Sequence, residues 1–146
     1  MDLFDWYLEF KYPYLRTSGY KITSPRDKRY NCIAWVVGDN TRWWDPDKDY
    51  YWPDRIPRVS TLTNFIKLFK YYGYENSDKS SIETGYEKIA LYIDNLGDFS
   101  HVCKQLPSGR WTSKLGNLQD IEHNSLEAFN KSGYGIVAKI LKRKTK

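Results

Sequence analysis

The sequence has little cysteine or histidine, with two residues of each, and no long apolar run. Two cysteines cannot form a disulfide framework, so we expect a reduced, intracellular protein. No segment approaches the length of a membrane span, and the first residues are acidic, without the apolar core of a signal peptide. These absences predict a cytoplasmic protein with no membrane partner, although export by a dedicated machine would leave no such mark.

A strong excess of one charge is also missing, because the formal net charge is +5 and the pI is about 9.1. Part of this charge lies in residues 139–146, which we expect to be a solvated terminus rather than a nucleic-acid contact. Aromatic residues, in contrast, make up 17% of the chain. Such a fraction is typical of a small domain that fills its core with large rings.

The length of the chain predicts one domain over residues 1–146. Within it we expect an N-terminal helix and connection over 1–29, a core over 30–143 and a basic tail over 144–146. Helices followed by an antiparallel sheet would make this an α+β fold.

The helices are predicted in the first half of the chain. Residues 2–10 have the spacing of a short amphipathic helix, and residues 61–72 repeat apolar side chains at i, i+3, i+4 and i+7 after a capping Ser60. The segment 31–38 predicts a third short helix, although its valines would also suit a strand. Residues 17–29 are polar and basic, and we expect an irregular connection there.

The strands are predicted in the second half, at residues 88–93, 101–106, 110–115 and 134–141. A Gly-containing turn separates the middle two, which is typical of a β-hairpin. In the last strand, alternation places Ile136, Ala138 and Ile140 on one face. Within residues 120–129 we expect a short helix capped by Asn124 or Ser125.

Cys32 is the first candidate for chemistry. It follows Asn31, a residue that caps helices well. A capped start would place the thiol among unpaired backbone N–H groups, at the positive end of the helix dipole, where thiols have a lowered pKa and act as nucleophiles. The ordinary alternative is a packed, inert thiol.

His101 is the second candidate, at the start of the first hairpin strand. An imidazole can take the proton of a thiol, and a third polar group can orient the ring through its other nitrogen. Candidates for that group are Thr112, Ser113, Lys114, Asp120 and Glu122. We take Ser113 as the third member. His123 is expected to anchor the loop after Gly116 or to supplement the site.

Tryptophans near Cys32 supply a possible cleft wall. Trp43, Trp44 and Trp52 lie in the aperiodic, Pro-rich stretch 39–57, and Trp35 follows Cys32 within its own segment. A long aromatic loop beside a nucleophile can line a substrate cleft. The alternative is that the loop folds over the core and covers it.

Several motifs in this order carry a resemblance to known proteins. They are Tyr30-Asn31-Cys32-Ile33-Ala34-Trp35, His101 through Gln105-Leu106, Gly109-Arg110-Trp111-Thr112-Ser113-Lys114-Leu115-Gly116, Asp120-Ile121-Glu122-His123 and Tyr134-Gly135. Over about residues 30–143 the chain resembles a family of small bacterial proteins of unknown function.

The order of Cys, His and next-strand polar residue is also similar to that of the papain-like NlpC/P60 superfamily of peptidases, amidases and acyltransferases. The chain departs from that pattern at Asn31-Cys32-Ile33-Ala34, where an Asp-Cys-Ser-Gly motif is common, and at Val102-Cys103, where a His-x-Gly pattern often occurs. The resemblance implies a papain-like, NlpC/P60-type domain in which helices precede an antiparallel sheet.

Together these observations predict a thiol hydrolase that acts on an amide or peptide bond. Cys32 would attack the carbonyl, and His101 would act first as base and then as acid, with Ser113 orienting the ring. Asn31 and His123 would support the site. No cofactor and no metal are expected, and neither the substrate nor the oligomeric state follows from the sequence.

Three other interpretations of the sequence stay open. The domain could be a catalytically inactive papain-like module that serves in binding or as a structural part. Two thiols and two imidazoles, Cys32, His101, Cys103 and His123, would suffice for one structural zinc, although their spacing is unusual. Residues 42–58 interleave basic and aromatic side chains as single-strand nucleic-acid sites do, but nearby aspartates would repel phosphate.

Overall fold

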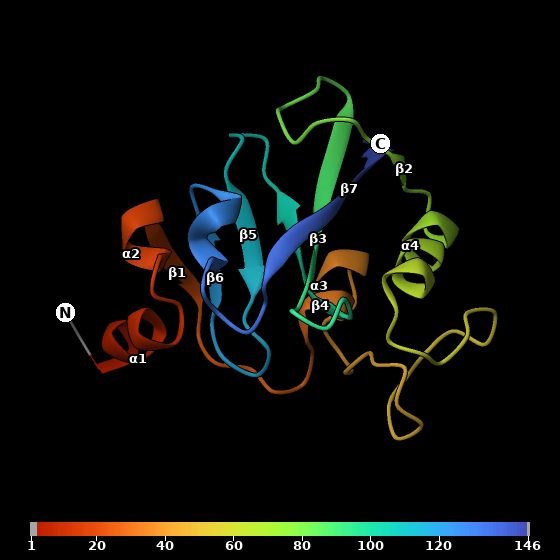
Figure 1. Ribbon diagram of the computed structural model, residues 1–146, viewed down its shortest axis with the longest axis horizontal. Helices are drawn as coiled ribbons and strands as arrows, with labels where there is room; N and C mark the ends of the chain where they lie inside the picture. Colours follow the sequence, from red (N-terminus) through yellow and green to blue (C-terminus); the bar gives the residue numbers. More distant parts are fainter. Residues whose placement is uncertain (1–2, 146) are drawn as a thin grey trace.

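A seven-stranded antiparallel sheet forms the centre of the molecule, in the order β1-β6-β5-β4-β3-β7-β2. The computed structural model describes residues 3–145. The strands are β1 Tyr20–Ser24, β2 Glu75–Asn76, β3 Tyr86–Ile93, β4 Phe99–Gln105, β5 Trp111–Lys114, β6 Asp120–His123 and β7 Ile136–Lys144. The helices are α1 Leu3–Lys11, α2 Leu15–Ser18, α3 Cys32–Val37, α4 Leu62–Tyr71 and the 3-10 helix η1 Leu126–Phe129. Figure 1 shows α1 and α2 beside the β1 edge and α4 beside the opposite edge.

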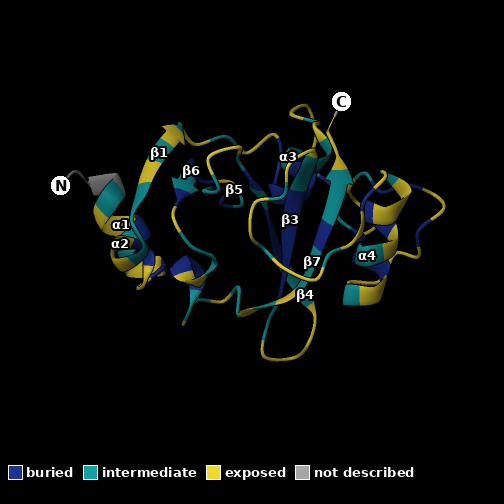
Figure 2. Ribbon diagram, turned by 90° about the horizontal axis from the view of Figure 1, so that it is seen from above, coloured by how far each residue is buried: buried dark blue, intermediate teal, exposed yellow. Residues whose placement is uncertain are grey.

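The sheet separates two apolar clusters. One face is covered by α3, α4 and the buried tryptophans of the aromatic loop, residues 39–57. Its apolar cluster includes Cys32 of α3, Phe65 of α4 and Val102 of β4. We call this face the thiol side. The other face packs Cys103 and Phe129 with α1, α2 and η1, and we call it the imidazole side. Strand β3 runs between the two clusters and is almost wholly buried, as Figure 2 shows.

The predicted helices are present with small shifts. Residue 2 lies outside the described residues, and α1 covers the rest of the first predicted helix. α3 begins at Cys32 and ends at Gly38, which adopts the left-handed conformation expected of a helix stop. α4 is capped by Thr61 rather than Ser60, because the Thr61 hydroxyl accepts the N–H of Asn64.

Three strands, β1, β2 and β6, were missing from the sequence prediction. The short helix expected within 120–129 is present as η1, which follows Ser125, one of its two expected capping residues. Residues 20–24 form β1 rather than an irregular connection, and residues 120–123 form β6 ahead of that helix. These two short strands pair with each other, so each supplies the backbone partners of the other. The 3-10 helix η1 follows β6.

The last strand differs from the prediction in two ways. A bulge lies opposite Leu91 and Tyr92, which face Lys139 and Val137, so the alternation expected from Ile136 to Ile140 is broken. Val137 and Ile140 both pack on the imidazole side. The expected basic tail is also shorter, because β7 continues to residue 144, and residue 146 lies outside the described residues.

These elements make up one α+β domain. The helix-then-sheet order holds only loosely, because β1 precedes α3 and α4 and because η1 lies between β6 and β7. Among the described residues, every helix is too short or too polar to cross a membrane.

Candidate functional site

Cys32 stands at the capped start of α3, as predicted. Asn31 has an extended backbone, and its side-chain oxygen accepts the N–H of Ala34 at 3.2 Å. Its side-chain nitrogen donates to the carbonyl oxygen of Trp44 at 2.6 Å. Asn31 therefore caps the helix and also ties it to the aromatic loop.

The thiol is buried and protonated at neutral pH. Burial raises the pKa of Cys32 to about 11, although backbone N–H groups of Val102, Ile33 and Cys32 itself lower it. The fall in pKa expected for a helix-start thiol is thus outweighed by loss of solvent. Val102 is the next residue after His101, so the sulfur meets β4 one peptide unit from the histidine.

A cavity of about 200 Å³ opens onto this thiol. Its walls come from α3, the aromatic loop, the start of β4 and the turns after β5 and η1. The lining includes Cys32, Trp43, Asp45, Phe99, Ser100 and Tyr134.

Of the tryptophans expected in a cleft wall, only Trp43 lines this cavity. Trp44 and Trp52 lie in the core, where their indole N–H groups donate to Asp39 Oδ2 at 2.8 Å and to Ile56 O at 3.0 Å. Trp35 is half-buried against the thiol-side core and stacks on Tyr30. The loop therefore does both things considered from the sequence, covering the core and supplying one wall residue.

His101 heads a chain of hydrogen bonds on the imidazole side. Its Nε2 lies 3.1 Å from Ser113 Oγ, and Ser113 Oγ lies 2.8 Å from His123 Nε2. His123 Nδ1 lies 2.9 Å from the carbonyl oxygen of Ser125. The side chains come from β4, β5 and β6, and all three are buried.

The end of this chain fixes the hydrogen positions. A carbonyl oxygen can only accept, so His123 Nδ1 carries the hydrogen that reaches Ser125. In a neutral ring Nε2 is then bare and accepts the Ser113 O–H. The Ser113 oxygen in turn accepts from His101 Nε2–H. This leaves His101 Nδ1 as a bare proton acceptor.

Both rings are neutral at neutral pH, as this assignment requires. Burial lowers the pKa of His101 well below its usual value, and His123 adds to that effect. Burial likewise lowers the pKa of His123 to about 4. His101 Nδ1 is itself buried and has no hydrogen-bond partner among the described residues.

The thiol and the imidazole lie on opposite sides of the sheet, and no hydrogen bond joins them. His101 contacts Tyr92, Phe129 and Tyr134 on the imidazole side, whereas Cys32 packs with Val102 on the thiol side. β4 and β5 pair at Lys104 with Thr112 and at Gln105 with Trp111. The pairing of these two strands therefore does not reach His101.

Tyr134 lies at the cavity that Cys32 lines and also contacts His101. It lines the cavity with Cys32, and its ring stacks on His101 with centroids 4.1 Å apart and planes at 4°. Ser100 donates to its carbonyl oxygen, and Tyr12 donates to its hydroxyl at 3.1 Å. The next residue, Gly135, has a positive φ, and a Cβ there would lie 2.0 Å from the carbonyl oxygen of Ile93.

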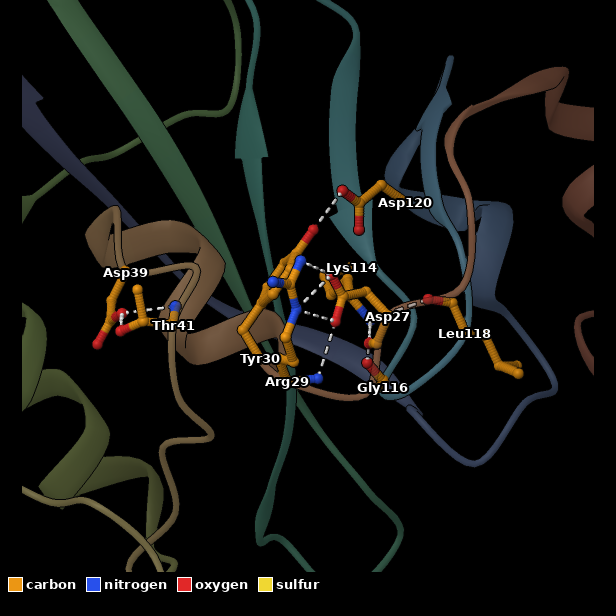
Figure 3. A network of polar contacts seen from close by, with 9 residues as sticks. All are labelled: Asp27, Arg29, Tyr30, Asp39, Thr41, Lys114, Gly116, Leu118 and Asp120. Atoms are coloured by element: carbon orange, nitrogen blue, oxygen red, sulfur yellow. Dashed lines mark hydrogen bonds and ion pairs between the residues drawn. The ribbon is translucent and has the colours of Figure 1, made fainter.

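Lys114 is a further buried polar residue. It was a candidate for the group that orients His101, but the sequence did not predict the contacts that it makes. It is fully buried, and its Nζ donates to the carbonyl oxygens of Asp27 at 2.6 Å, Leu118 at 2.9 Å and Gly116. It lies 5.0 Å from the centre of the Tyr30 ring, whose hydroxyl donates to Asp120 at 3.0 Å. Figure 3 shows these groups gathered around the lysine.

Among residues 3–145, no group of three or more His, Cys, Asp and Glu side chains is placed to hold a metal ion. The zinc reading of Cys32, His101, Cys103 and His123 therefore has no site in this part of the chain. Both histidine Nε2 atoms face Ser113 instead.

Fold and site together describe a one-domain α+β protein with a buried thiol beside a histidine relay. A family model for a domain of unknown function, DUF7689, matches residues 21–142, and the chain belongs to this family. The expectation of a family without known function is confirmed in that form. The match begins earlier than the expected core and includes β1. No curated protein and no solved structure matches the chain.

Proposed function

We propose that this protein is a thiol hydrolase of the peptidase or amidase type, with Cys32 as nucleophile and His101 as base. The observation that carries the proposal is the hydrogen-bond chain from Ser125 through His123 and Ser113, which leaves His101 Nδ1 bare and buried. A base held in one tautomer by a third polar group is what nucleophilic catalysis by a thiol requires.

The position of the thiol supports the same reading. Cys32 lines the cavity, and its sulfur lies at the backbone N–H of Val102, next to His101 in the chain. The proposed reaction needs the Cys32 side chain to move toward His101 Nδ1, past the part of β4 that is not paired with β5, when substrate fills the cavity. Hydrogen bonds between catalytic groups often tighten in this way on substrate binding.

In the proposed reaction the proton moves during attack rather than before it, because both thiol and ring are neutral at rest. The sulfur forms a bond to the carbonyl carbon while its proton passes to His101 Nδ1. That proton then goes to the leaving amine as the C–N bond breaks, which leaves a thioester. Water, giving a proton to the same nitrogen, attacks the thioester and releases the acid as the thiol regains its proton.

The test uses p-nitrophenyl acetate as a generic acyl donor. Peptide mapping by mass spectrometry follows acetylation of Cys32, and absorbance follows release of p-nitrophenol. We expect Cys32 to be acetylated and turned over in the wild-type protein. Cys103→Ala should behave like the wild type, while Cys32→Ala should release p-nitrophenol only at the background rate of surface amines.

Acetylation confined to lysines, or turnover that survives in Cys32→Ala, would contradict the proposed function. Acetylation confined to lysines would favour the alternative, an inactive domain of this fold that serves in binding. One observation favours that alternative, namely the raised pKa of the buried thiol.

A further inference from the structure

Lys114 is matched to its surroundings as a cation rather than as a neutral amine. Its three backbone acceptors, on Asp27, Gly116 and Leu118, equal in number the three N–H bonds of an ammonium group. A neutral amine has two N–H bonds and would leave one of these buried oxygens unpaired. The face of the Tyr30 ring, 5.0 Å from Nζ, is a further partner that suits a cation.

The three carbonyls belong to the two segments that frame the thiol. Asp27 lies in the stretch that leads into α3, three residues before Tyr30 and five before Cys32. Gly116 lies in the turn after β5 and lines the cavity together with Cys32. One buried side chain thus ties the entry of the nucleophile helix to the opposite cavity wall, as Figure 3 shows for the lysine and its partners.

We propose that Lys114 is a positioning residue for Cys32, one that keeps a fixed positive charge near the thiol through its bonds to the entry of α3 and to the cavity wall. This inference rests on the proposed function for its meaning in catalysis. Its physical content is independent of any substrate. A buried cation favours the thiolate over the thiol, and it does the same for the negative charge that develops during attack.

Lys114 and Cys32 shift each other's pKa in the directions that a cation near a thiol requires. The charge of Lys114 lowers the pKa of Cys32, and Cys32 in turn raises the pKa of Lys114, although burial lowers that of Lys114 overall. The other titratable groups that face the ammonium are Asp27, Tyr30 and Asp120. Those that face the thiol are Tyr12, Cys103 and Tyr134, with Asp45 on the cavity wall.

The test measures the rate at which iodoacetamide alkylates Cys32 at pH 8, with peptide mapping to separate it from Cys103. Lys114→Gln keeps an amide NH2 group with two N–H donors and removes the charge. We expect alkylation of Cys32 to slow by about two- to threefold, because the backbone N–H groups lower the pKa of Cys32 more than the charge of Lys114 does. Looser packing alone would expose the thiol and speed the reaction, so the direction of the change separates charge from structure.

Lys88 supplies a matched control. It is also fully buried, and its Nζ donates to the carbonyl oxygen of Lys79 at 2.9 Å and pairs with Glu83 at 3.4 Å, away from the cavity. Lys88→Gln should leave the alkylation rate of Cys32 unchanged. If Lys114→Gln does not fold, Lys114→Met serves in its place, and thermal unfolding reports the folded fraction of each variant.

An unchanged or faster alkylation of Cys32 in the folded Lys114 variant would overturn the inference, and so would equal slowing in Lys88→Gln. The readout involves no acyl donor. Failure of p-nitrophenyl acetate turnover therefore removes the hydrolase proposal without deciding this one, and a null result here leaves the hydrolase test standing.

Discussion

The two sides of the sheet hold the two halves of the candidate site in different environments. On the thiol side, Cys32 lines a cavity beside an aromatic loop and a serine-lined wall. On the imidazole side, His101 is enclosed by the rings of Tyr92, Phe129 and Tyr134, and its Nε2 is fixed by Ser113. One half has room for a ligand, and the other has fixed geometry and a fixed tautomer.

The contrast between the two cysteines makes the same point. Cys103 lies in the middle of β4 on the imidazole side and is fully buried, and burial raises its pKa further than that of Cys32. Cys32 differs in lining the cavity and in meeting backbone N–H groups at a helix start. Position, rather than the presence of a thiol, separates a candidate nucleophile from a core residue.

The largest expected effect breaks the link between the two sides. His101→Gln removes the bare Nδ1 that the proposed reaction uses as base. We expect acetylation of Cys32 by p-nitrophenyl acetate to slow by about 10²–10⁴-fold, the usual contribution of a positioned base. A rate within a few-fold of wild type in a folded variant would show that the imidazole side takes no part in the chemistry.

The second prediction concerns the stability of the protein in acid, which depends on the two buried histidines of the imidazole side. The folded pKa values of His101 and His123 lie below the unfolded value, so the unfolded chain binds protons first as the pH falls. Stability is therefore complete above about pH 6.5 and declines below it. We expect a loss of about 2 kcal/mol per histidine between pH 7 and pH 5, measured by urea unfolding.

The control for the acid prediction is His123→Gln. This variant should be less stable than wild type at pH 7 and should lose less stability between pH 7 and pH 5. Carboxylates with lowered pKa values, such as Glu122, destabilise the fold only at lower pH. Equal losses in the two proteins would show that His123 is not buried in its neutral form.

The third prediction tests the strand that joins the histidines. Ser113→Ala leaves His101 Nε2 and His123 Nε2 without their common partner. We expect a loss of about 1–3 kcal/mol in the free energy of unfolding, the cost of leaving buried polar groups unpaired. Thr112→Val, the neighbouring position on the other side of β5, is the matched control and should cost less.

The smallest effect sharpens the comparison of the thiols. Iodoacetamide at pH 9 should alkylate Cys32 at least about tenfold faster than Cys103, because Cys32 lines the cavity and its pKa is the less raised. Peptide mapping measures both rates in one sample. Equal rates would mean that both thiols react through global unfolding and that the cavity gives no access.

Much of the fold could be predicted from local patterns. The stripe of α4, the cap at Asn31 and the hairpin of β4 and β5 each depend on residues within a few positions of one another. β1 and β6 could not be predicted in this way, because they are short and pair with each other across about a hundred residues. The alternation of Tyr20 and Ile22, both packed on the imidazole side, was the available signal.

A comparable part of the candidate site could be predicted from the sequence. Residue types and order suggested Cys32, His101 and a polar residue on the next strand, and the register of β5 selects Ser113 from its neighbours by hydrogen-bonding it to His101. Lys114 was only one of several candidates for the orienting group, and its full burial could not be foreseen because a lysine is rarely fully buried. Tyr134 contributes through a ring stack formed between segments distant in the chain, which no local pattern encodes.

Gly135 has a consequence for how substitutions in this protein are interpreted. Any side chain at this position would meet the backbone of Ile93, and the displacement would pass directly to the neighbouring Tyr134 and its stack on His101. Loss of activity on changing this glycine would therefore report the placement of a ring rather than the loss of a reacting group. A mutational scan scored by activity alone would count it among the chemical residues, and a parallel measurement of folding is what separates the two.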